Sequence, residues 1–186
     1  MQFEELHTER LRLRKFTPEV YDHIHKTMDD KQLMAVLGVA DTEALEKERE
    51  KYQKGLATHN RTFVNFQVID RQTGNIIGGC GFHTWFPHHN RAEIGYGLFN
   101  DEHKRKGLMT EALAAVLDYG FGPMGLHRVE ALVAEWNNPS LKLLAKFNFT
   151  FEGTLREHYN VDGVMEDSVM YALLKQEHKL PKKSII

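Results

Sequence analysis

The chain has 186 residues, of which 41% are hydrophobic and 27% charged, and its formal net charge is -2 at pH 7. A chain of this length is typical of one domain that folds without disulfides or a structural metal. Because the charge is near neutral, neither nucleic acid nor an anionic membrane is expected as a partner.

Targeting signals are absent from the sequence. No apolar run reaches the roughly 18 residues of a membrane-spanning helix, and the first residues lack the basic start and apolar core of a signal peptide. The single cysteine, Cys80, cannot form an internal disulfide, which fits a reducing compartment. We therefore expect a cytoplasmic protein without a membrane segment.

The first half of the chain predicts a strand, two helices and three further strands. Residues 11–14 alternate apolar and basic side chains, the pattern of a half-buried strand. Thr17 and Pro18 form a helix start, as N-cap and first helical residue, and this helix is expected to reach about Met28. A second, charged helix is expected over residues 42–58. Three extended segments with short turns between them then predict an antiparallel meander: 62–69, 76–86 and 92–96.

The second half predicts two helices among three more strands. Residues 109–121 place apolar side chains at the helical period, and a Gly-Pro pair follows them as a stop signal. Asn138 as N-cap and Pro139 as first residue begin another helix, expected to reach about Phe147. The strands are expected at 129–134 and on either side of Asp162-Gly163, ending near Leu174. This order predicts one α+β domain around a mostly antiparallel sheet.

A basic, glycine-containing junction at residues 104–110 connects the meander to the longest predicted apolar helix. A helix N-terminus leaves backbone N–H groups unpaired and attracts phosphate or pyrophosphate. Gly107 lets the main chain approach such a group closely, and Lys104, Arg105 and Lys106 add positive charge. Neither the Walker pattern nor GxGxxG is present. Taken alone, these residues also fit a solvated basic surface.

With this order of elements the chain resembles the GNAT superfamily of acetyltransferases. The superfamily signature (Arg/Gln)-x-x-Gly-x-(Gly/Ala) matches residues 104–109, with Lys104 and Met109 at its two departing positions. Within the superfamily, the chain is similar over residues 8–175 to the ribosomal-protein N-terminal acetyltransferases of the RimJ/RimL type. That likeness rests on residues 8–14, 92–96, 107–113, 137–140, 146–149 and 162–174, with Asn148 where the family usually has glycine.

The resemblance implies a GNAT fold, with a central sheet of about seven strands and flanking helices. It places one acetyltransferase domain at residues 8–175 and a polar tail at 176–186. It also implies acetyl-CoA as co-substrate and a strand that parts from its neighbour near Gly97 to bind the pantetheine arm. The residues then expected to bind CoA are Leu98, Phe99, Lys104, Arg105, Lys106, Gly107, Leu108, Met109, Thr110, Asn137 and Ser140.

Glu93 is the first candidate for the general base. Strand alternation puts it on one face with Arg91, beside the expected acetyl site, so its carboxylate could accept a proton through a water. A structural carboxylate paired with Arg91 or another base explains the same residue about equally well. Three acidic residues of the last predicted hairpin are alternatives that also fit turns and surface: Glu157, Asp162 and Glu166.

Ser140 is the candidate that returns a proton to the leaving thiolate. The resemblance implies this role, because many GNAT enzymes use a tyrosine at the position of Leu144, and the RimJ/RimL group is proposed to use a serine in its place. Capping of the helix explains Ser140 equally well, and Asn137 fits either a pantetheine contact or a simple turn. A backbone N–H near Gly97 is expected to stabilise the oxyanion of a tetrahedral intermediate.

The acceptor is expected to be a primary amine, most simply the N-terminal α-amine of a protein or peptide. With a pKa near 8, roughly a tenth of such amines are neutral at pH 7, against far fewer lysine side chains. Small amines such as polyamines, amino sugars and antibiotics are the alternative, and a CoA-binding sensor is the non-enzymatic one. The 11 histidines show no metal-ligand spacing, so no metal is expected. The resemblance also implies a possible homodimer.

Overall fold

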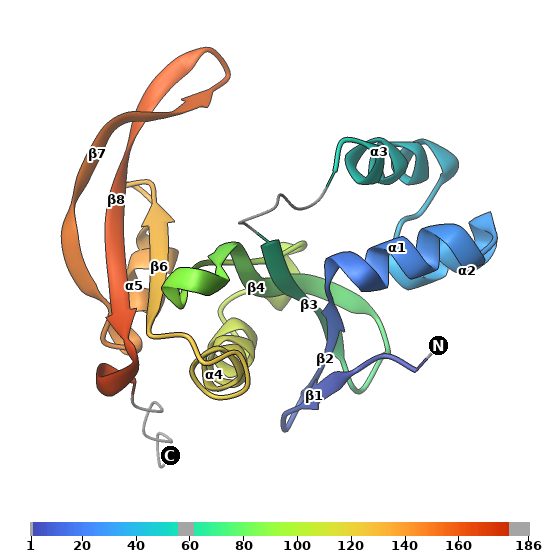
Figure 1. The fold of residues 1–186 in the computed structure, drawn as a ribbon, viewed down its shortest axis with the longest axis horizontal. Helices are drawn as coiled ribbons and strands as arrows, with labels where there is room; N and C mark the ends of the chain where they lie inside the picture. The colour runs from blue at the N-terminus through green and yellow to red at the C-terminus, as the bar shows by residue number, and fades with distance from the viewer. Residues whose placement is uncertain (1, 56–61, 179–186) are drawn as a thin grey trace.

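A computed structural model describes residues 2–55 and 62–178, which form one eight-stranded sheet with helices on both faces (Figure 1). The spatial order of the strands is β1-β2-β3-β4-β5-β6-β8-β7. β5 and β6 pair in parallel, whereas the other neighbouring strands pair antiparallel. The predicted α+β fold with a mostly antiparallel sheet is confirmed, with eight strands in place of about seven.

In the described residues, five α-helices and three short 3-10 helices accompany the strands. The strands are β1 (Glu5–His7), β2 (Leu11–Phe16), β3 (Thr62–Asp70), β4 (Ile76–Phe86), β5 (Arg91–Leu98), β6 (Arg128–Val133), β7 (Thr150–Val161) and β8 (Val164–Leu174). The helices are α1 (Pro18–Thr27), α2 (Asp30–Leu37), α3 (Thr42–Gln53), η1 (Pro87–His89), η2 (Asp101–His103), α4 (Leu108–Phe121), α5 (Asn138–Lys146) and η3 (Lys175–Glu177). None of these described helices is long and apolar enough to cross a membrane.

Two short elements near the N-terminus were not predicted, and one helix is shorter than expected. β1 has only three residues and pairs with β2. α2 begins with a capping box, in which Asp29 and Gln32 satisfy each other's backbone N–H groups, and it ends at Gly38 with φ 73°. α3 ends at Gln53, and residues 56–58 of the expected helix lie outside the described residues.

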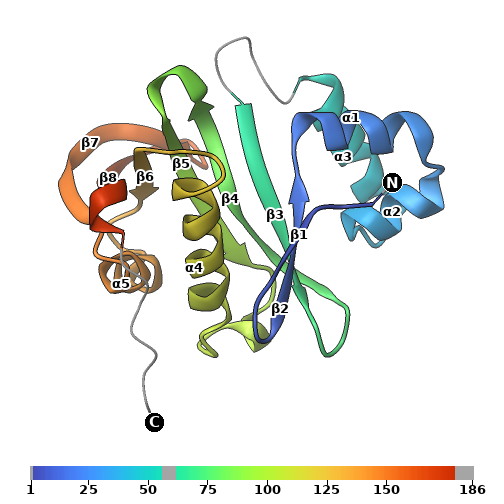
Figure 2. The same cartoon turned by 60° about the horizontal axis from the view of Figure 1, so that its bottom comes forward.

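The main core lies between the sheet and the helices α4 and α5 (Figure 2). Leu113, Val116 and Leu117 of α4 recur at the helical period and are fully buried, which is why this helix was predicted. α4 ends at Phe121, with Gly122 as its C-cap, as predicted. Leu144 of α5 is also fully buried in this core.

In the described residues, the opposite face of the sheet is covered near β2 and β3, by α1, α2 and α3. Leu13 of β2 points into the main core, whereas Phe16 belongs to a second core with Ile24, Leu33 and Leu45 of the three helices. Thr17 caps α1 by accepting from the N–H of Val20, as predicted.

The last two strands form a long hairpin that extends beyond the sheet. β8 pairs with β6 only from Val169 to Leu174, so the outer part of the hairpin has no third strand and protrudes from the body (Figure 1). Asp162 and Gly163 form its turn, as predicted, and both have positive φ. The uncovered face of β4 to β6 therefore lies between this hairpin and the α1–α3 helices.

Candidate active site

The parallel strands β5 and β6 separate in the middle of the sheet. Their pairing covers three positions and stops at Glu93↔Glu130, although β5 continues to Leu98 and β6 to Val133. This is the parting of strands that the resemblance implies. It opens the centre of the sheet to both faces.

The backbone of β5 presents free groups toward this opening. Phe99 N–H donates to the carbonyl of Ile77 at 3.0 Å, and Gly97 lies opposite Gly79 in the same ladder. Because hydrogen-bonding residues alternate along an antiparallel strand, the N–H and C=O of Tyr96 and Leu98 point away from β4, toward the opening. These two residues, and not Phe99, supply the backbone groups that could pair with a pantetheine arm.

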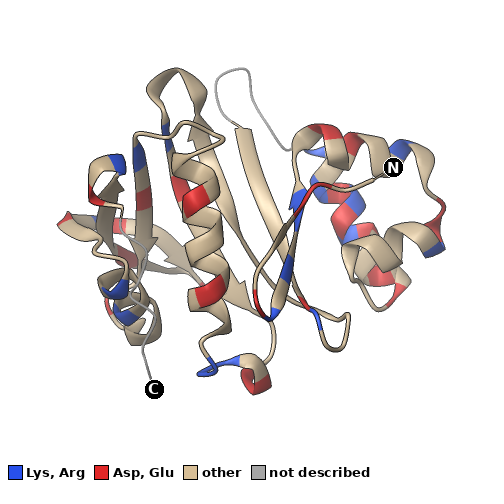
Figure 3. Cartoon of the chain, turned by 90° about the horizontal axis from the view of Figure 1, so that it is seen from below, with Lys and Arg blue, Asp and Glu red and all other residues tan. Residues whose placement is uncertain are grey.

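The junction before α4, residues 104–110, forms a loop whose geometry suits an anion, and we call it the anion-binding loop. Arg105 and Gly107 have φ values of 61° and 75°, and Gly107 occupies the N-cap position of α4 without a side-chain cap. Within the described residues, no protein acceptor bonds the backbone N–H groups of residues 106–110. These groups gather at the positive end of the helix dipole, which suits a pyrophosphate. Figure 3 shows the basic residues of this loop beneath α4.

The turn between β1 and β2 holds the anion-binding loop in place. Arg10 Nη1 donates to the carbonyl of Lys106 at 2.9 Å, and Arg10 Nε and backbone N–H both donate to Glu111 at 2.7 Å. Thr8 Oγ1 donates to the same carboxylate at 2.6 Å. The sequence motif at residues 8–10 therefore has a structural reason, which is to fix the start of α4.

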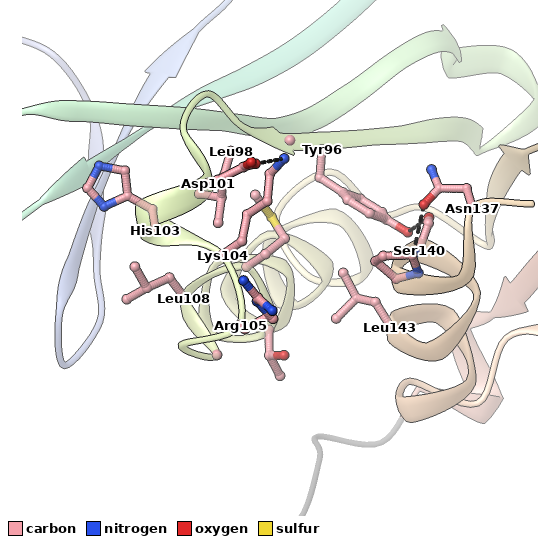
Figure 4. A pocket seen from close by; sticks show the side chains of 15 residues that line it. Tyr96, Leu98, Asp101, His103, Lys104, Arg105, Leu108, Asn137, Ser140 and Leu143 are labelled. Atoms are coloured by element: carbon pink, nitrogen blue, oxygen red, sulfur yellow. Dashed lines mark hydrogen bonds and ion pairs between the residues drawn. The ribbon is translucent and has the colours of Figure 1, made fainter.

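A pocket of about 670 Å³ connects the anion-binding loop with the opening between β5 and β6 (Figure 4). Nine residues predicted to bind CoA line it: Leu98, Lys104, Arg105, Gly107, Leu108, Met109, Thr110, Asn137 and Ser140. Phe99 and Lys106 do not line it, and the Phe99 side chain is 68% exposed. Lining residues that were not predicted as CoA contacts are Tyr96, Gly97, Asp101, His103, Pro139 and Leu143.

The two departures from the superfamily signature are both accommodated in the pocket wall. Lys104 Nζ forms an ion pair with Asp101 at 2.6 Å, which lowers the pKa of that carboxyl. Met109 lines the pocket and also packs against the main core.

Tyr96 and Ser140 join the sheet to α5 inside the pocket. Tyr96 Oη lies 2.7 Å from Ser140 Oγ, and burial raises the pKa of Tyr96 to about 12, so the phenol keeps its proton. The cap of α5 is Asn137, whose Oδ1 accepts from the N–H of Ser140 at 3.2 Å. The prediction that Asn138 is the N-cap is therefore wrong, because the helix starts one residue earlier and Asn138 is its first residue. The Ser140 hydroxyl is consequently not the helix cap.

Tyr96 was not singled out from the sequence. Strand alternation placed it on the face of Ala92 and Ile94, which are core residues, so packing explained it. Tyr96 shares the face of these core residues, but it lies beyond the last residue of β5 that pairs with β6. At that point the same face of β5 lines the pocket. Leu144, at the position of the usual tyrosine, is fully buried, and its neighbour Leu143 lines the pocket.

Glu93 lies on the opposite face of β5 and does not line the pocket. Of the predicted structural pairs, the one with Arg91 is wrong, because Arg91 Nη1 and Arg128 Nε both bond Glu130, each at 2.8 Å. The other predicted possibility, a pair with another base, is represented by His83. In the described residues no lysine or arginine pairs with Glu93, and its nearest basic group is His83 Nδ1 at 3.7 Å. Burial, together with the Glu130 carboxylate, raises the pKa of Glu93, as suits a group that must accept a proton.

The other acidic candidates lie on the hairpin. Asp162 forms its turn, Glu157 is exposed, and Glu166 accepts a hydrogen bond from Trp136 Nε1 at 3.2 Å. Trp136 itself is 69% exposed. No group of three or more His, Cys, Asp or Glu side chains that could hold a metal occurs in the part of the chain that the structure describes.

The sequence and fold match known acetyltransferases. The family model described as an acetyltransferase (GNAT) domain matches residues 10–150. The chain belongs to the GNAT acetyltransferase family. An uncharacterized N-acetyltransferase of Bacillus licheniformis, p20, is 35% identical over 94% of this chain and 98% of its own. A GNAT-family acetyltransferase structure from Bacillus anthracis has a TM-score of 0.64 and 30% identity, covering 93% of this chain and 99% of its own.

More distant GNAT relatives differ in the acceptors that their names give. A putative ribosomal N-acetyltransferase of Bacillus subtilis is 33% identical over 56% of each chain. A spermidine N(1)-acetyltransferase of Escherichia coli is 26% identical over 53% of this chain and 54% of its own. This GNAT protein is therefore an N-acetyltransferase that uses acetyl-CoA. Its anion-binding loop and the free groups of β5 are the features that fit that co-substrate.

Proposed function

We propose that this GNAT enzyme, acting in the cytoplasm, acetylates the α-amine of a protein or peptide N-terminus, in the manner of the ribosomal-protein type. The observation that carries the proposal is the composition of the sheet face around Glu93. This face lies on the other side of the sheet from the pocket that fits CoA. The opening between β5 and β6 connects the two sides. An acceptor amine can therefore meet the thioester from that side.

The carboxylates on this face suit one positive charge rather than several. Glu130 is neutralised by two arginines, and Glu152 by Arg128. Glu93 is left without a lysine or arginine partner among the described residues. A polyamine carries several cations and would be expected to meet a row of unpaired carboxylates.

Apolar side chains continue from this face along the hairpin. Tyr159, Val161 and Val164 are exposed on the hairpin face that also carries Glu166, and Glu166 bonds Trp136. A peptide presents one cationic amine followed by side chains, several of which can be apolar. The combination of one half-buried carboxylate, Glu93, with an apolar wall whose own carboxylate, Glu166, is engaged by Trp136 favours such an acceptor.

The chain's own groups supply each requirement of a direct transfer. The backbone N–H groups of Tyr96 and Leu98 are available to stabilise an oxyanion. Glu93 is the general base, and the proton of the amine reaches it through a bridging water or side chain. Ser140, supported by Tyr96, is placed to return a proton to the leaving thiolate. Each role is assigned from the position of the group in the site and from its chemistry.

A kinetic panel tests the acceptor. We expect free-N-terminus peptides to give kcat/KM values for CoA thiol release at least about tenfold above the same peptides with blocked N-termini and one internal lysine. Spermidine is the competing acceptor, which the similarity to a spermidine acetyltransferase favours. A preference for spermidine would contradict the proposal. Acetyl-CoA binding without turnover of any amine would instead indicate a sensor.

A homodimer is also predicted for this enzyme. Light scattering at micromolar concentration, with and without acetyl-CoA, measures it directly. A mass of two chains is expected, and a mass of one chain in both conditions would contradict it.

A further inference from the structure

His83 is a histidine beside Glu93 that none of the roles above uses. It lies on β4 directly across from Glu93, at the last position before β5 and β6 separate. We propose that the His83 imidazole bridges the acceptor amine and Glu93, in place of a water: its Nε2 takes the proton from the amine, and Glu93 orients the ring. The inference rests on the proposed direct transfer and deepens it by naming the group that contacts the amine.

The first observation is where the ring lies. A Cβ added to Gly95 would come within 2.9 Å of His83 Nε2 and 3.0 Å of Cδ2, so the imidazole covers the backbone of Gly95. Gly95 lies two residues beyond the last pair of β5 with β6, in the separated part of the strand. The next residue, Tyr96, presents its N–H to the opening. The proton acceptor and the oxyanion donor are thus neighbours on one strand, as the reaction requires.

The second observation is how the other ring nitrogen is held. His83 Nδ1 lies 3.2 Å from Thr84 Oγ1 and 3.7 Å from Glu93 Oε2. A proton on Nδ1 faces these oxygens, which leaves Nε2, on the Gly95 side of the ring, without a proton and able to accept one. This is the arrangement of a carboxylate-oriented general base, in which the carboxylate also stabilises the imidazolium that forms.

The third observation is backbone strain next to the pair. Thr84 has φ 49°, an unusual conformation for a β-branched residue, and the register of β4 on β5 shifts between His83 and Phe86. Strained residues and β-bulges cluster at functional sites, where they redirect side chains. Here the irregularity sets Thr84 Oγ1 beside His83 Nδ1. A regular strand would send successive side chains to opposite faces.

The electrostatic surroundings suit a base at neutral pH. Burial lowers the pKa of His83, so the imidazole is neutral at pH 7, while 45% of its side chain stays exposed to an incoming amine. The ionisable groups around the pair are Glu93 on β5, Glu130 on β6, and His158 and Tyr159 on β7. Ionised Glu93 favours the imidazolium once the proton has moved, which partly opposes the effect of burial.

The step balances without an oxidant or reductant. The amine lone pair forms the C–N bond to the acetyl carbon, and the thioester C–S bond breaks with its electron pair going to sulfur. The proton from nitrogen moves to His83 Nε2 and then to water through the exposed edge of the ring. The thiolate takes its proton on the other side of the sheet, from the Ser140 hydroxyl and its Tyr96 partner, and this pair recovers a proton from water.

The test compares H83Q with the control H88Q, which changes an exposed histidine in the adjoining turn. We use whichever amine the wild type accepts best, so the result does not depend on the acceptor class. H83Q is expected to lower kcat about 100-fold, while the acetyl-CoA Kd stays at the wild-type value. H88Q should match the wild type in both measurements.

Three further readouts separate a catalytic from a structural role. The acid limb of the kcat/KM profile is expected to weaken from a two-proton to a one-proton dependence in H83Q, because the amine itself still titrates. Imidazole added to H83A should restore part of the rate. In E93Q, NMR titration should show a lower His83 pKa than in the wild type, because the stabilising carboxylate is lost. An H83Q enzyme with wild-type kcat and an intact acid limb would overturn the inference, as would a His83 pKa unchanged by E93Q.

Discussion

Tyr96 of β5 and Ser140 of α5 form a hydrogen-bonded pair where the strand and the helix meet. Neither hydroxyl has another side-chain partner among the described residues, and the two residues, 2.7 Å apart at their oxygens, both line the pocket. Because burial raises the pKa of Tyr96 to about 12, the phenol acts as a neutral hydrogen-bond partner at physiological pH. The pair therefore fixes the direction of the Ser140 hydroxyl.

We expect this coupling to appear as non-additive kinetics. S140A should lower kcat about tenfold, and Y96F about threefold to tenfold, the net contribution of one hydrogen bond. The double variant should be close to S140A, because Tyr96 acts through Ser140. Measured kcat values that multiply independently would contradict the pairing.

Glu111 gives a pH prediction of defined sign. Burial opposes its ionisation, but hydrogen bonds from Thr8 and Arg10 together lower its pKa below the ordinary 4.5. A carboxyl with a lowered pKa stabilises the fold above its unfolded-state pKa, and this stabilisation is lost as the pH falls through the folded-state value. Thermal unfolding of wild type and E111Q should therefore differ most above about pH 5, with the difference shrinking toward pH 3.5. A difference that grows on acidification would contradict this assignment.

At the scale of elements, the anion-binding loop depends on a turn almost one hundred residues earlier in the chain. Arg10 connects the β1–β2 turn to both the Lys106 carbonyl and the first turn of α4. The loop's backbone N–H groups are thereby held toward the pocket. This contact positions the loop and does not line the pocket itself.

Removal of this connection should weaken binding of acetyl-CoA more than catalysis. R10A is expected to raise the KM for acetyl-CoA about fivefold with kcat nearly unchanged, since Arg10 is partly exposed and its contacts are screened. R12A is the matched control, because Arg12 pairs with Glu5 at 3.6 Å and makes no contact with the loop. Equal KM values for R10A and R12A would contradict a positioning role.

How far the sequence predicts this structure depends on how local each feature is. Helix α4 and the Gly107 loop follow from periodicity and glycine chemistry within a few residues, so both were predicted. Helix α2 was not, because its eight residues are too few to establish a period, although Asp29 and Gly38 carry its start and stop signals. The roles assigned to His83 and Tyr96 depend on their cross-strand neighbours and on the separation of β5 and β6. Those relationships are tertiary and leave no local pattern.

At the scale of the whole molecule, the sheet separates two substrates that meet through its centre. α4, α5 and the anion-binding loop define one face, and the α1–α3 helices and the β7–β8 hairpin border the other (Figures 1 and 2). The reacting groups divide in the same way, with Tyr96 and Ser140 on the first face and His83 and Glu93 on the second. In the proposed mechanism, one side therefore protonates the thiolate and the other deprotonates the amine.

Mass spectrometry of one reaction tests the central claim most directly. A peptide with both a free N-terminus and an internal lysine is incubated with the enzyme, acetyl-CoA and an equimolar amount of spermidine, and the acetylated nitrogen is located by fragmentation. We predict a single acetyl group on the peptide α-nitrogen, with spermidine and the lysine essentially unmodified. Acetylation of spermidine or of the lysine, with the α-amine left free, would contradict it.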